Sequence, residues 1–241
     1  MAGVEPRYRS ILLKLSGEAL AGTRGHGIDP DIAEHIISEV KQVYDAGVKV
    51  GIVIGGGNIY RGASGPIART TGDMMGMLAT VINALALKEF FCSADIPAVA
   101  FSALRIDKAA EFFSADKARA VLNGGSIIIM AGGTGNPFFT TDTAAALRAA
   151  EIDAEVIIKA TQVDGVYDSD PVKNPDAVRY ETVSYDEALQ KNLKVMDSTA
   201  LSFCRDNSIP IVVFKLSDKG KLFKFVMGET IGSLITKGVE K

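Results

Sequence analysis

The sequence predicts an α/β fold, a three-layer αβα sandwich around a mostly parallel central sheet. Short runs rich in β-branched residues alternate along the chain with segments of helical periodicity, which is the pattern of βαβ units. The 24 glycines gather where the apolar runs stop, so we expect the strands to end in tight, glycine-rich loops.

Five apolar runs are expected to form buried strands. They cover residues 11–15, 48–54, 126–131, 156–158 and 211–214. The runs are almost continuously apolar, which is typical of strands in a parallel sheet that is covered on both faces.

The segments between these runs predict helices. Asp29 and Pro30 supply an N-cap and a first-turn proline to a helix that stops before Gly47. Residues 74–87 are uncharged and rich in alanine, which predicts a helix buried on most sides. Residues 184–187, Ser-Tyr-Asp-Glu, have the spacing of a capping box before a further helix.

Length and composition indicate one ordinary globular domain. The 241 residues are 47% apolar and 23% charged, so the chain can bury a large core without a disulfide or a metal. We find no linker and no internal repeat. We therefore predict a single domain over residues 1–241, with two lobes.

Charge and cysteine content exclude several classes of protein. The 26 basic and 29 acidic residues give a net charge of −3, which argues against a general nucleic-acid or membrane-surface binder. Cys92 and Cys204 share no close motif, which indicates reduced thiols in the cytoplasm, and with only two histidines a Cys/His zinc site is nearly excluded. The N-terminus predicts no targeting segment. Residues 120–141 are uncharged, but their five glycines and one proline predict a helix end, a strand and a loop rather than a membrane span.

Lys14 ends the first strand and is followed by Ser16 and Gly17. A lysine in a buried strand is costly unless its ammonium emerges at the strand end and meets an anion. Lys14 is therefore a candidate phosphate ligand. The alternative is an edge-strand lysine with a solvated head.

The second strand is followed by Gly55, Gly56 and Gly57, with Asn58 and Arg61 close behind. Consecutive amides without side chains form an anion-binding nest. A helix that began near Asn58 would add positive potential, and Arg61 can clamp a phosphate bidentately. The alternative is a tight turn whose glycines only relieve backbone strain.

The third and fourth strands also end in loops with unusual chemistry. Residues 132–142 combine glycine amides and three threonines with Phe138 and Phe139 and end at Asp142. The two phenylalanines could wall a nucleotide base, or they could plug the core while Asp142 caps the next helix. Tyr167, after the fourth strand, could be a platform for adenine or a packed residue of a hairpin.

Familiar phosphate and hydrolase motifs are missing. The chain has no G-x-x-x-x-G-K-[ST], no G-x-G-x-x-G at a strand-to-helix junction and no G-x-S-x-G elbow. Neither His26 nor His35 has the setting of a catalytic triad, and His35 is expected to be a surface residue. Phosphate is therefore expected to be held by several glycine loops that converge with lysine and arginine.

These loops resemble those of the bacterial uridylate kinases, which belong to the amino acid kinase family. The matching segments are residues 14–20, 55–58, 61–62, 72–80, 133–142, 159–166 and 195–197, so the resemblance covers nearly the whole chain. It implies an amino acid kinase-like fold and ATP-dependent phosphorylation of UMP to UDP with Mg²⁺, in pyrimidine nucleotide biosynthesis. It also implies a cytoplasmic homo-oligomer, a hexamer, with an acceptor lobe before about residue 150 and an ATP lobe after it.

The resemblance also assigns residues to the site. Lys14 and Arg61 would face the oxygens of the transferred phosphoryl group, and Asp142 would orient Lys14 or a metal-bound water. No residue is assigned as a metal ligand. The ATP side would be formed by Lys14, Leu15, Ser16, Gly17, Gly57, Arg61, Thr161, Gln162, Tyr167 and Asp170. The UMP side would be formed by Gly56, Asp73, Thr134, Gly135, Asn136, Pro137, Phe138, Phe139, Thr140 and Thr141, with Asp73 accepting from ribose hydroxyls.

Regulators are implied in the same way. Uridylate kinases are commonly activated by GTP and inhibited by UTP. The segment linked to GTP activation matches Gly22, Thr23, Arg24, Gly25, His26 and Gly27. Arginines that help to hold GTP in enterobacterial relatives fall near Ala98, Val99 and Ser126, which are not basic. We therefore expect weak activation by GTP, and inhibition by UTP through the UMP site.

Two other functions stay open. A kinase of the same fold could act on a carboxylate or carbamate, such as acetylglutamate, but that function gives no reason for Asp73 or for Phe138 and Phe139. A non-catalytic nucleotide- or oxyanion-binding protein could use the same glycine loops, but it would not need Lys14 and Asp142. No nucleic-acid or membrane partner is expected.

Overall fold

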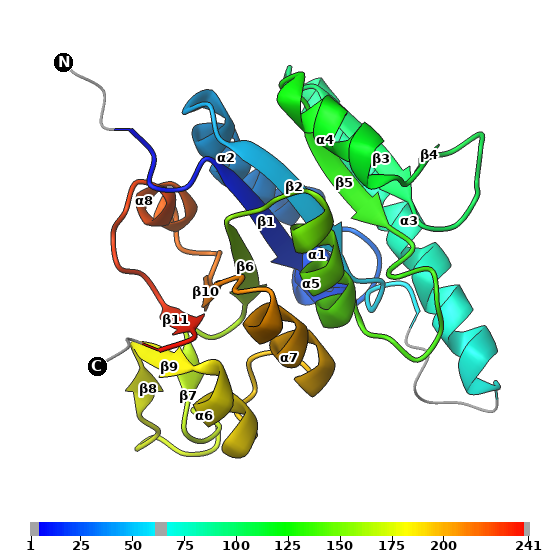
Figure 1. Ribbon diagram of the computed structural model, residues 1–241. Coiled ribbons are helices and arrows are strands. Elements are labelled where there is room, and N and C mark those ends of the chain that lie inside the picture. The colour runs from blue at the N-terminus through cyan, green and yellow to red at the C-terminus, as the bar shows by residue number, and fades with distance from the viewer. Residues whose placement is uncertain (1–4, 61–66, 239–241) are drawn as a thin grey trace.

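A nine-stranded sheet forms the middle of the protein in a computed structural model that describes residues 5–60 and 67–238 (Figure 1). The strand order is β4-β3-β5-β2-β1-β6-β10-β11-β9. The bounds are β1 Ser10–Leu15, β2 Lys49–Ile54, β3 Ala98–Ser102, β4 Glu111–Phe112, β5 Ile127–Ala131, β6 Val156–Thr161, β9 Thr182–Ser184, β10 Ile211–Lys215 and β11 Ser233–Thr236. Neighbouring strands are parallel except β10 and β11, so the predicted mostly parallel sheet is confirmed.

The five predicted strands correspond to β1, β2, β5, β6 and β10, with small shifts at their ends. Sequence patterns missed β3, because only Val99 in its Ala-Val-Ala-Phe-Ser run is β-branched. They also missed the short edge strands and the separate hairpin of β7 (Val166–Tyr167) and β8 (Arg179–Tyr180).

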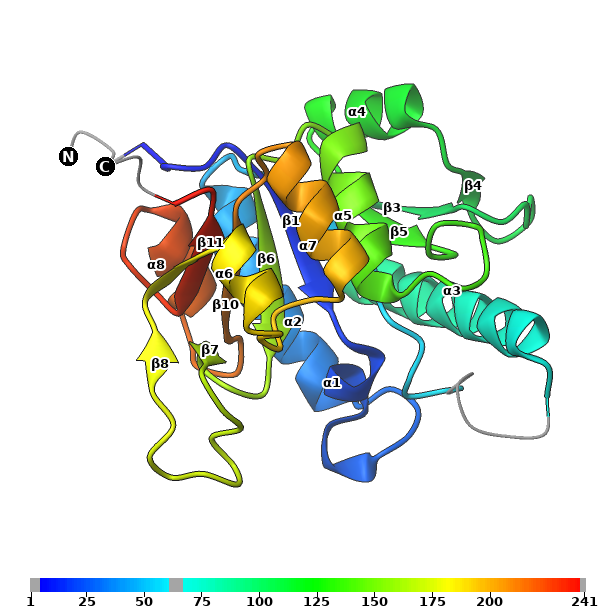
Figure 2. The ribbon, with the colours of Figure 1, turned by 60° about the horizontal axis from the view of Figure 1, so that its bottom comes forward.

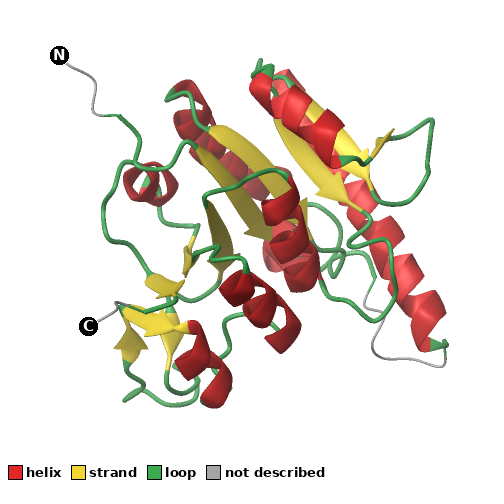
Figure 3. Ribbon diagram, in the orientation of Figure 1, coloured by secondary structure: helices red, strands yellow, loops and turns green. Residues whose placement is uncertain are grey.

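Helices cover both faces of the sheet, which gives the predicted three layers (Figures 2 and 3). Successive strand residues point to opposite faces, so Leu13 packs in a core with α2, α3 and α8, and Leu12 packs in a core with α4, α5 and α7. The bounds are α1 Gly17–Ala21, α2 Pro30–Asp45, α3 Arg69–Ser93, α4 Ala115–Asn123, α5 Thr141–Glu151, α6 Tyr185–Gln190, α7 Ser198–Asp206 and α8 Lys221–Val226. Strands from before and after residue 150 belong to this one sheet, and the division into two lobes stays a prediction.

The predicted helix starts are found at α2 and α6. The Asp29 carboxylate accepts from the amide of Asp31, with Pro30 in the first turn, and the Ser184 hydroxyl accepts from the amide of Glu187. The expectation that His35 is a surface residue is wrong. Its ring is half-buried, and Nε2 lies 3.0 Å from the carbonyl oxygen of Leu216, because the segment between β10 and α8 covers that side of α2.

The apolar helix predicted over residues 74–87 is the middle of α3, which is 25 residues long. By length and composition α3 could cross a membrane, with a mean hydropathy of 1.4. This is weak evidence, because core helices of soluble proteins pass the same test, and 44% of the apolar window lies inside the molecule. The helix α3 packs on β3 and β5, and its N-terminal half lines the first cavity of the site described next.

Candidate active site

The carboxyl ends of β1, β2, β5 and β6 meet at one edge of the sheet, and the candidate residues follow them. In parallel α/β sheets this is the edge at which ligands bind. Two cavities lie there. The first is lined by residues that follow β2 and β5, and the second by residues that follow β6. Because β1 lies between β2 and β6, the end of β1 falls between the two groups of loops.

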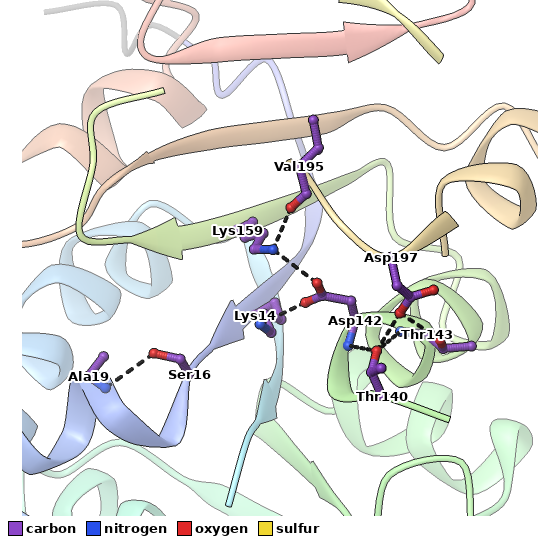
Figure 4. Close-up of polar contacts among 9 residues, drawn as sticks. All are labelled: Lys14, Ser16, Ala19, Thr140, Asp142, Thr143, Lys159, Val195 and Asp197. Carbon is purple, nitrogen blue, oxygen red and sulfur yellow. Dashed lines mark hydrogen bonds and ion pairs between the residues drawn. The ribbon is translucent and has the colours of Figure 1, made fainter. Parts of the chain in front are cut away.

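Two lysines and one aspartate form a compact charged cluster at this point (Figure 4). Nζ of Lys14 lies 2.7 Å from Oδ1 of Asp142, and Nζ of Lys159 donates to Oδ2 at 2.9 Å and also to the carbonyl oxygen of Val195. Lys14 is only 8% exposed and stands on a central strand, so it is not an edge lysine with a solvated head. Oδ1 of Asp142 is buried and accepts no well-aligned hydrogen bond within the described residues, so its contact with Lys14 is an ion pair.

The charges in this cluster are strongly coupled. Burial raises the pKa of the Asp142 carboxyl, but the ammonium groups of Lys14 and Lys159 outweigh burial and hold that pKa below its ordinary value. Burial lowers the pKa of Lys159, and Asp142 offsets this only in part because the nearby Lys14 repels a second charge. Asp142 is therefore an ionised holder of two cations and a poor base.

Asp142 is not the N-cap of α5. It lies in the first turn of that helix, which holds it in place. The N-cap is Thr140, whose hydroxyl accepts from the amides of Asp142 and Thr143. The Thr140 hydroxyl itself donates to Asp197, which also accepts from the Thr143 hydroxyl at 2.9 Å. Asp197 in turn caps α7 by accepting from the amide of Ala200. It belongs to a matched motif, but its role in fixing α5 could not be read from the sequence.

The glycines of the turn after β2 are needed because other segments approach them closely, and not because the turn has a strained backbone. None of its three glycines has a positive φ. A Cβ on Gly56 would lie 2.6 Å from the carbonyl oxygen of Gly76 in α3, and one on Gly17 would lie 2.6 Å from the amide nitrogen of Gly57. No helix begins at Asn58, since residues 57–59 make a turn, so the positive potential considered for a helix start there is not present.

The amides of this turn are available to a ligand. Within residues 5–60 and 67–238, neither Gly56 nor Gly57 donates its backbone N–H to a protein acceptor. Gly56 is buried. Buried backbone N–H groups are usually paired, so the Gly56 amide in particular is suited to donate to a ligand acceptor such as a phosphate oxygen.

The first cavity has a volume of about 560 Å³ and contains much of the predicted UMP side. Gly56, Asp73, Thr134, Asn136, Phe139, Thr140 and Thr141 line it, whereas Gly135, Pro137 and Phe138 do not. Gly57, which was predicted for the ATP side, also lines this cavity. The other lining residues were not predicted for the UMP side: Glu18, Tyr60, Arg69, Gly72, Gly76, Met77, Thr80 and Gly133. Gly72, Gly76, Met77 and Thr80 lie in the matched segment 72–80, which could have pointed to them, whereas Arg69 enters the cavity only because α3 packs on the turn.

The carboxylate of Asp73 is already engaged in this cavity. Nε of Arg69 donates to both of its oxygens at 2.8 Å, and the amide of Phe138 donates to Oδ2 at 2.8 Å. Burial raises the pKa of Asp73, but the Phe138 amide and Arg69 together hold it below the ordinary value. The Arg69 guanidinium also lies over the Phe138 ring, 5.8 Å from its centroid.

The loop after β5 keeps its aromatic side chains out of the core. Phe138 and Phe139 are 64% and 50% exposed, so they do not plug the core. Gly132, Gly133 and Gly135 have φ values of +75°, +58° and +84°, which only glycine adopts readily.

The second cavity, of about 290 Å³, lies beside the β7–β8 hairpin and contains part of the predicted ATP side. Tyr167 and Asp170 line it, together with the missed Lys191 and Lys194. The Tyr167 hydroxyl donates to Asp164 at 2.6 Å. Thr161 donates to the carbonyl oxygen of Val163, and Gln162 is exposed beside it.

The remaining predicted residues are placed as follows. The Ser16 hydroxyl caps α1 by accepting from the amide of Ala19. Leu15 belongs to the scaffold, because its side chain is in the core and its carbonyl accepts from the Gly55 amide. Arg61 lies outside the described residues. Gly22, Thr23, Arg24, Gly25, His26 and Gly27 form a short 3₁₀ turn, η1 (Gly22–Arg24), and the loop after it.

Comparison with known proteins identifies the class. Residues 9–215 match the amino acid kinase family, and the chain belongs to this family. It is 50% identical over 237 residues to the uridylate kinase of Pseudomonas paraeruginosa and 49% identical to that of Pseudomonas aeruginosa, each match covering 97% of both chains.

Solved structures agree with this assignment. The fold is similar to a UMP kinase from Bacillus anthracis, with a TM-score of 0.93, 36% identity and coverage of 96% of this chain and 97% of that one. It is also similar to a UMP kinase from Ureaplasma parvum, with a TM-score of 0.89, 35% identity and coverage of 96% and 100%. The resemblance predicted from the loop motifs is thereby confirmed.

Proposed function

We propose that this chain is a UMP kinase, which transfers the γ-phosphoryl group of ATP to UMP and releases ADP and UDP. The observation that carries the proposal is the cluster of Lys14, Asp142 and Lys159 between two cavities of nucleotide size. The identity to uridylate kinases over nearly the whole chain supports the choice of acceptor.

The cluster suits phosphoryl transfer because that reaction needs positioning and charge neutralisation more than a base of special pKa. The donor would enter beside the β7–β8 hairpin and the acceptor beside α3. Lys14 and Lys159 would neutralise the oxygens of the group in transit, and the amides of Gly56 and Gly57 would hold them in line. Arg61 is proposed to join them.

Recognition of the acceptor would use the groups of the first cavity. Asp73 would accept from the ribose hydroxyls, which requires Arg69 and the Phe138 amide to share or release its oxygens. Phe139, with Thr134 and Asn136, would contact the base. These groups favour a nucleoside monophosphate over the alternative acceptor, an amino-acid carboxylate.

Mg²⁺ would arrive with ATP. No group of three or more His, Cys, Asp or Glu side chains suited to a metal ion occurs in residues 5–60 and 67–238. Mg²⁺ is usually held through nucleotide phosphates and water with one or two protein carboxylates. Asp142 would orient such a water while it contacts Lys14 and Lys159. When bound, Mg²⁺ would neutralise charge on the phosphates.

We further propose a cytoplasmic homo-oligomer, a hexamer, regulated by GTP and UTP. Support for assembly comes from α3, where Met74, Leu78 and Ile82 are 38%, 44% and 53% exposed and follow one another at four-residue spacing. Free Cys92 and Cys204 suit a reducing compartment.

A coupled assay of ADP release tests the function, with ATP as donor and UMP, CMP, dUMP and acetylglutamate as separate acceptors. Preferred turnover of UMP is expected. Transfer to acetylglutamate and not to UMP would establish the carboxylate kinase, and nucleotide binding without turnover would establish a binding protein.

A further inference from the structure

Two buried asparagine side chains form a closed pair behind the glycine turn. Asn83, in the middle of α3, has no exposed surface, and Asn58, just after the turn, is 4% exposed. Each Nδ2 donates to the other's Oδ1, at 2.7 Å from Asn83 and 2.9 Å from Asn58. Buried amides that lose a partner carry a desolvation cost, so such a pair strongly favours one arrangement.

The second N–H of each amide holds a backbone carbonyl. Nδ2 of Asn83 donates to the carbonyl oxygen of Gly55 at 2.8 Å. Nδ2 of Asn58 donates to the carbonyl oxygen of Gly27 at 2.7 Å, and the Gly27 amide donates back to the carbonyl of Asn58 at 2.9 Å. The pair therefore joins three segments that are distant in sequence: the end of β2, the middle of α3 and the loop after η1.

The bond to Gly55 determines where the next amide points. A trans peptide is planar, with its carbonyl oxygen and its N–H on opposite sides. Since Asn83 holds the oxygen of Gly55, the N–H of Gly56 is turned away from Asn83. Gly56 lines the first cavity, and its amide donates to no acceptor within the described residues.

We propose that Asn83 is a positioning residue for phosphoryl transfer. It acts through the peptide between Gly55 and Gly56, whose orientation it fixes so that the amides of the turn face the phosphate oxygens. Asn58 is the partner that keeps the Asn83 amide from rotating. The expected effect on kcat rests on the proposed function. The expected effect on anion binding rests on the geometry alone.

The kinetic test compares two truncations on the same helix. Asn83→Ala removes the anchor of the turn, and Leu87→Ala, one turn further along α3 and equally buried, removes apolar packing without removing that anchor. Small misplacements of reacting groups cost up to about a hundredfold in rate, so kcat for UMP phosphorylation should fall roughly tenfold to a hundredfold in Asn83→Ala. Leu87→Ala, assayed well below its unfolding midpoint in urea, should keep kcat within about threefold of wild type. Equal losses in the two variants, or normal kcat in Asn83→Ala, would overturn the proposal.

A double-mutant cycle separates positioning from loss of core packing. If Asn58 acts through Asn83, the variant carrying both Asn58→Ala and Asn83→Ala should lose no more kcat than Asn83→Ala alone. Independent, multiplying losses would contradict a shared role. If Asn83→Ala fails to fold, the single variant Asn58→Ala takes its place in the comparison with Leu87→Ala.

Calorimetric titration with inorganic triphosphate tests the geometry without turnover. The wild-type protein should bind triphosphate, and Asn83→Ala should bind it about tenfold more weakly, the effect of roughly one hydrogen bond to a charged group. Leu87→Ala should bind it as wild type does. Absent binding by wild type, or unchanged binding by Asn83→Ala, refutes the inference. If wild type binds triphosphate but does not phosphorylate UMP, the proposed function fails and this titration alone decides the role of Asn83.

Discussion

Lys14 and Lys159 are cross-strand partners in the pairing of β1 with β6, and they contact opposite oxygens of one carboxylate. Neighbouring strands lie about 4.8 Å apart, so the sheet itself brings the two ammonium groups together. Asp142 contacts both ammonium groups, so the three side chains together carry one positive charge, and Asp197 acts on Lys159 from further away. That arrangement is suited to the oxygens of a phosphoryl group in transit.

Loss of the Lys14 ammonium should lower turnover rather than acceptor binding. We expect Lys14→Ala to reduce kcat by roughly 10²–10³, which is the usual cost of one preorganised donor in a transition state, with little change in the KM for UMP. Steady-state kinetics against both substrates measure this. Lys41→Ala, on the exposed face of α2, is the control and should behave as wild type. Near-normal kcat in Lys14→Ala would make Lys14 a purely structural residue.

Activity should fall at an alkaline pH that is low for a lysine. Burial lowers the pKa of Lys159 from its ordinary value of 10.5, so this ammonium loses its proton, and its stabilising charge, before an exposed lysine does. In a pH profile of kcat/KM, the alkaline limb of wild type should therefore lie below that value. Lys159→Arg keeps the charge at all accessible pH values and should shift the limb upward, whatever its absolute rate. A profile with the same alkaline limb in both proteins would exclude Lys159 as the titrating group, and recovery of activity on return to neutral pH controls for unfolding.

Asp73 should act on the acceptor and not on ATP. Asp73→Asn keeps the shape but weakens acceptance from ribose hydroxyls, so the KM for UMP should rise more than the KM for ATP. A site that hydrogen-bonds a hydroxyl discriminates against analogues that lack it, so dUMP should be a poor substrate of wild type. Because Arg69 holds the same carboxylate, Arg69→Ala should also raise the KM for UMP. Equal changes in both KM values, or efficient dUMP phosphorylation, would argue against this contact.

The fold was largely predictable because its strands are nearly continuous apolar runs. The failures have physical causes: β3 is rich in alanine, and the edge strands are too short to carry a pattern. In the site, the sequence located Lys14 and Asp142 because a buried lysine and an acid after a glycine loop stand out.

Other site residues carry no local signal. Lys159 begins a matched segment, but no sequence pattern assigned it a role in the site, and only the register of β6 with β1 places it opposite Lys14. Arg69 and Asn83 enter the site because α3 packs on the glycine turn, where Gly56 meets Gly76. Such contacts depend on tertiary packing and could not be derived from spacing.

Assembly should depend on the apolar stripe of α3. We expect Leu78→Glu to shift the protein to a smaller species in light scattering at micromolar concentration, because a buried charge in an apolar contact is costly. Glu89→Gln, on the same helix at an exposed position, should leave the mass unchanged. A monomeric wild type would show that the stripe is not a contact surface.

GTP should activate weakly. The resemblance implies that arginines holding GTP in enterobacterial relatives would fall near Ala98, Val99 and Ser126, which are not basic. Each charge-assisted contact is worth about 1.5–3 kcal/mol, so the loss of two would weaken binding by about two orders of magnitude or more. Arg24, in the loop predicted to respond to GTP, is engaged with the α2 N-cap, its Nε 3.3 Å from Oδ2 of Asp29. Arg105 is engaged as well, lying 4.5 Å from the Phe112 ring centroid.

A titration of GTP at subsaturating ATP measures the response, with UTP as the comparison. We expect little activation at low micromolar GTP, and inhibition by UTP that added UMP relieves, since UTP would occupy the UMP site. Arg24→Ala should then change the UTP response little. Several-fold activation at low micromolar GTP would mean that other cations have replaced the missing arginines, and its loss in Arg105→Ala or Lys88→Ala would identify which of them holds the phosphates.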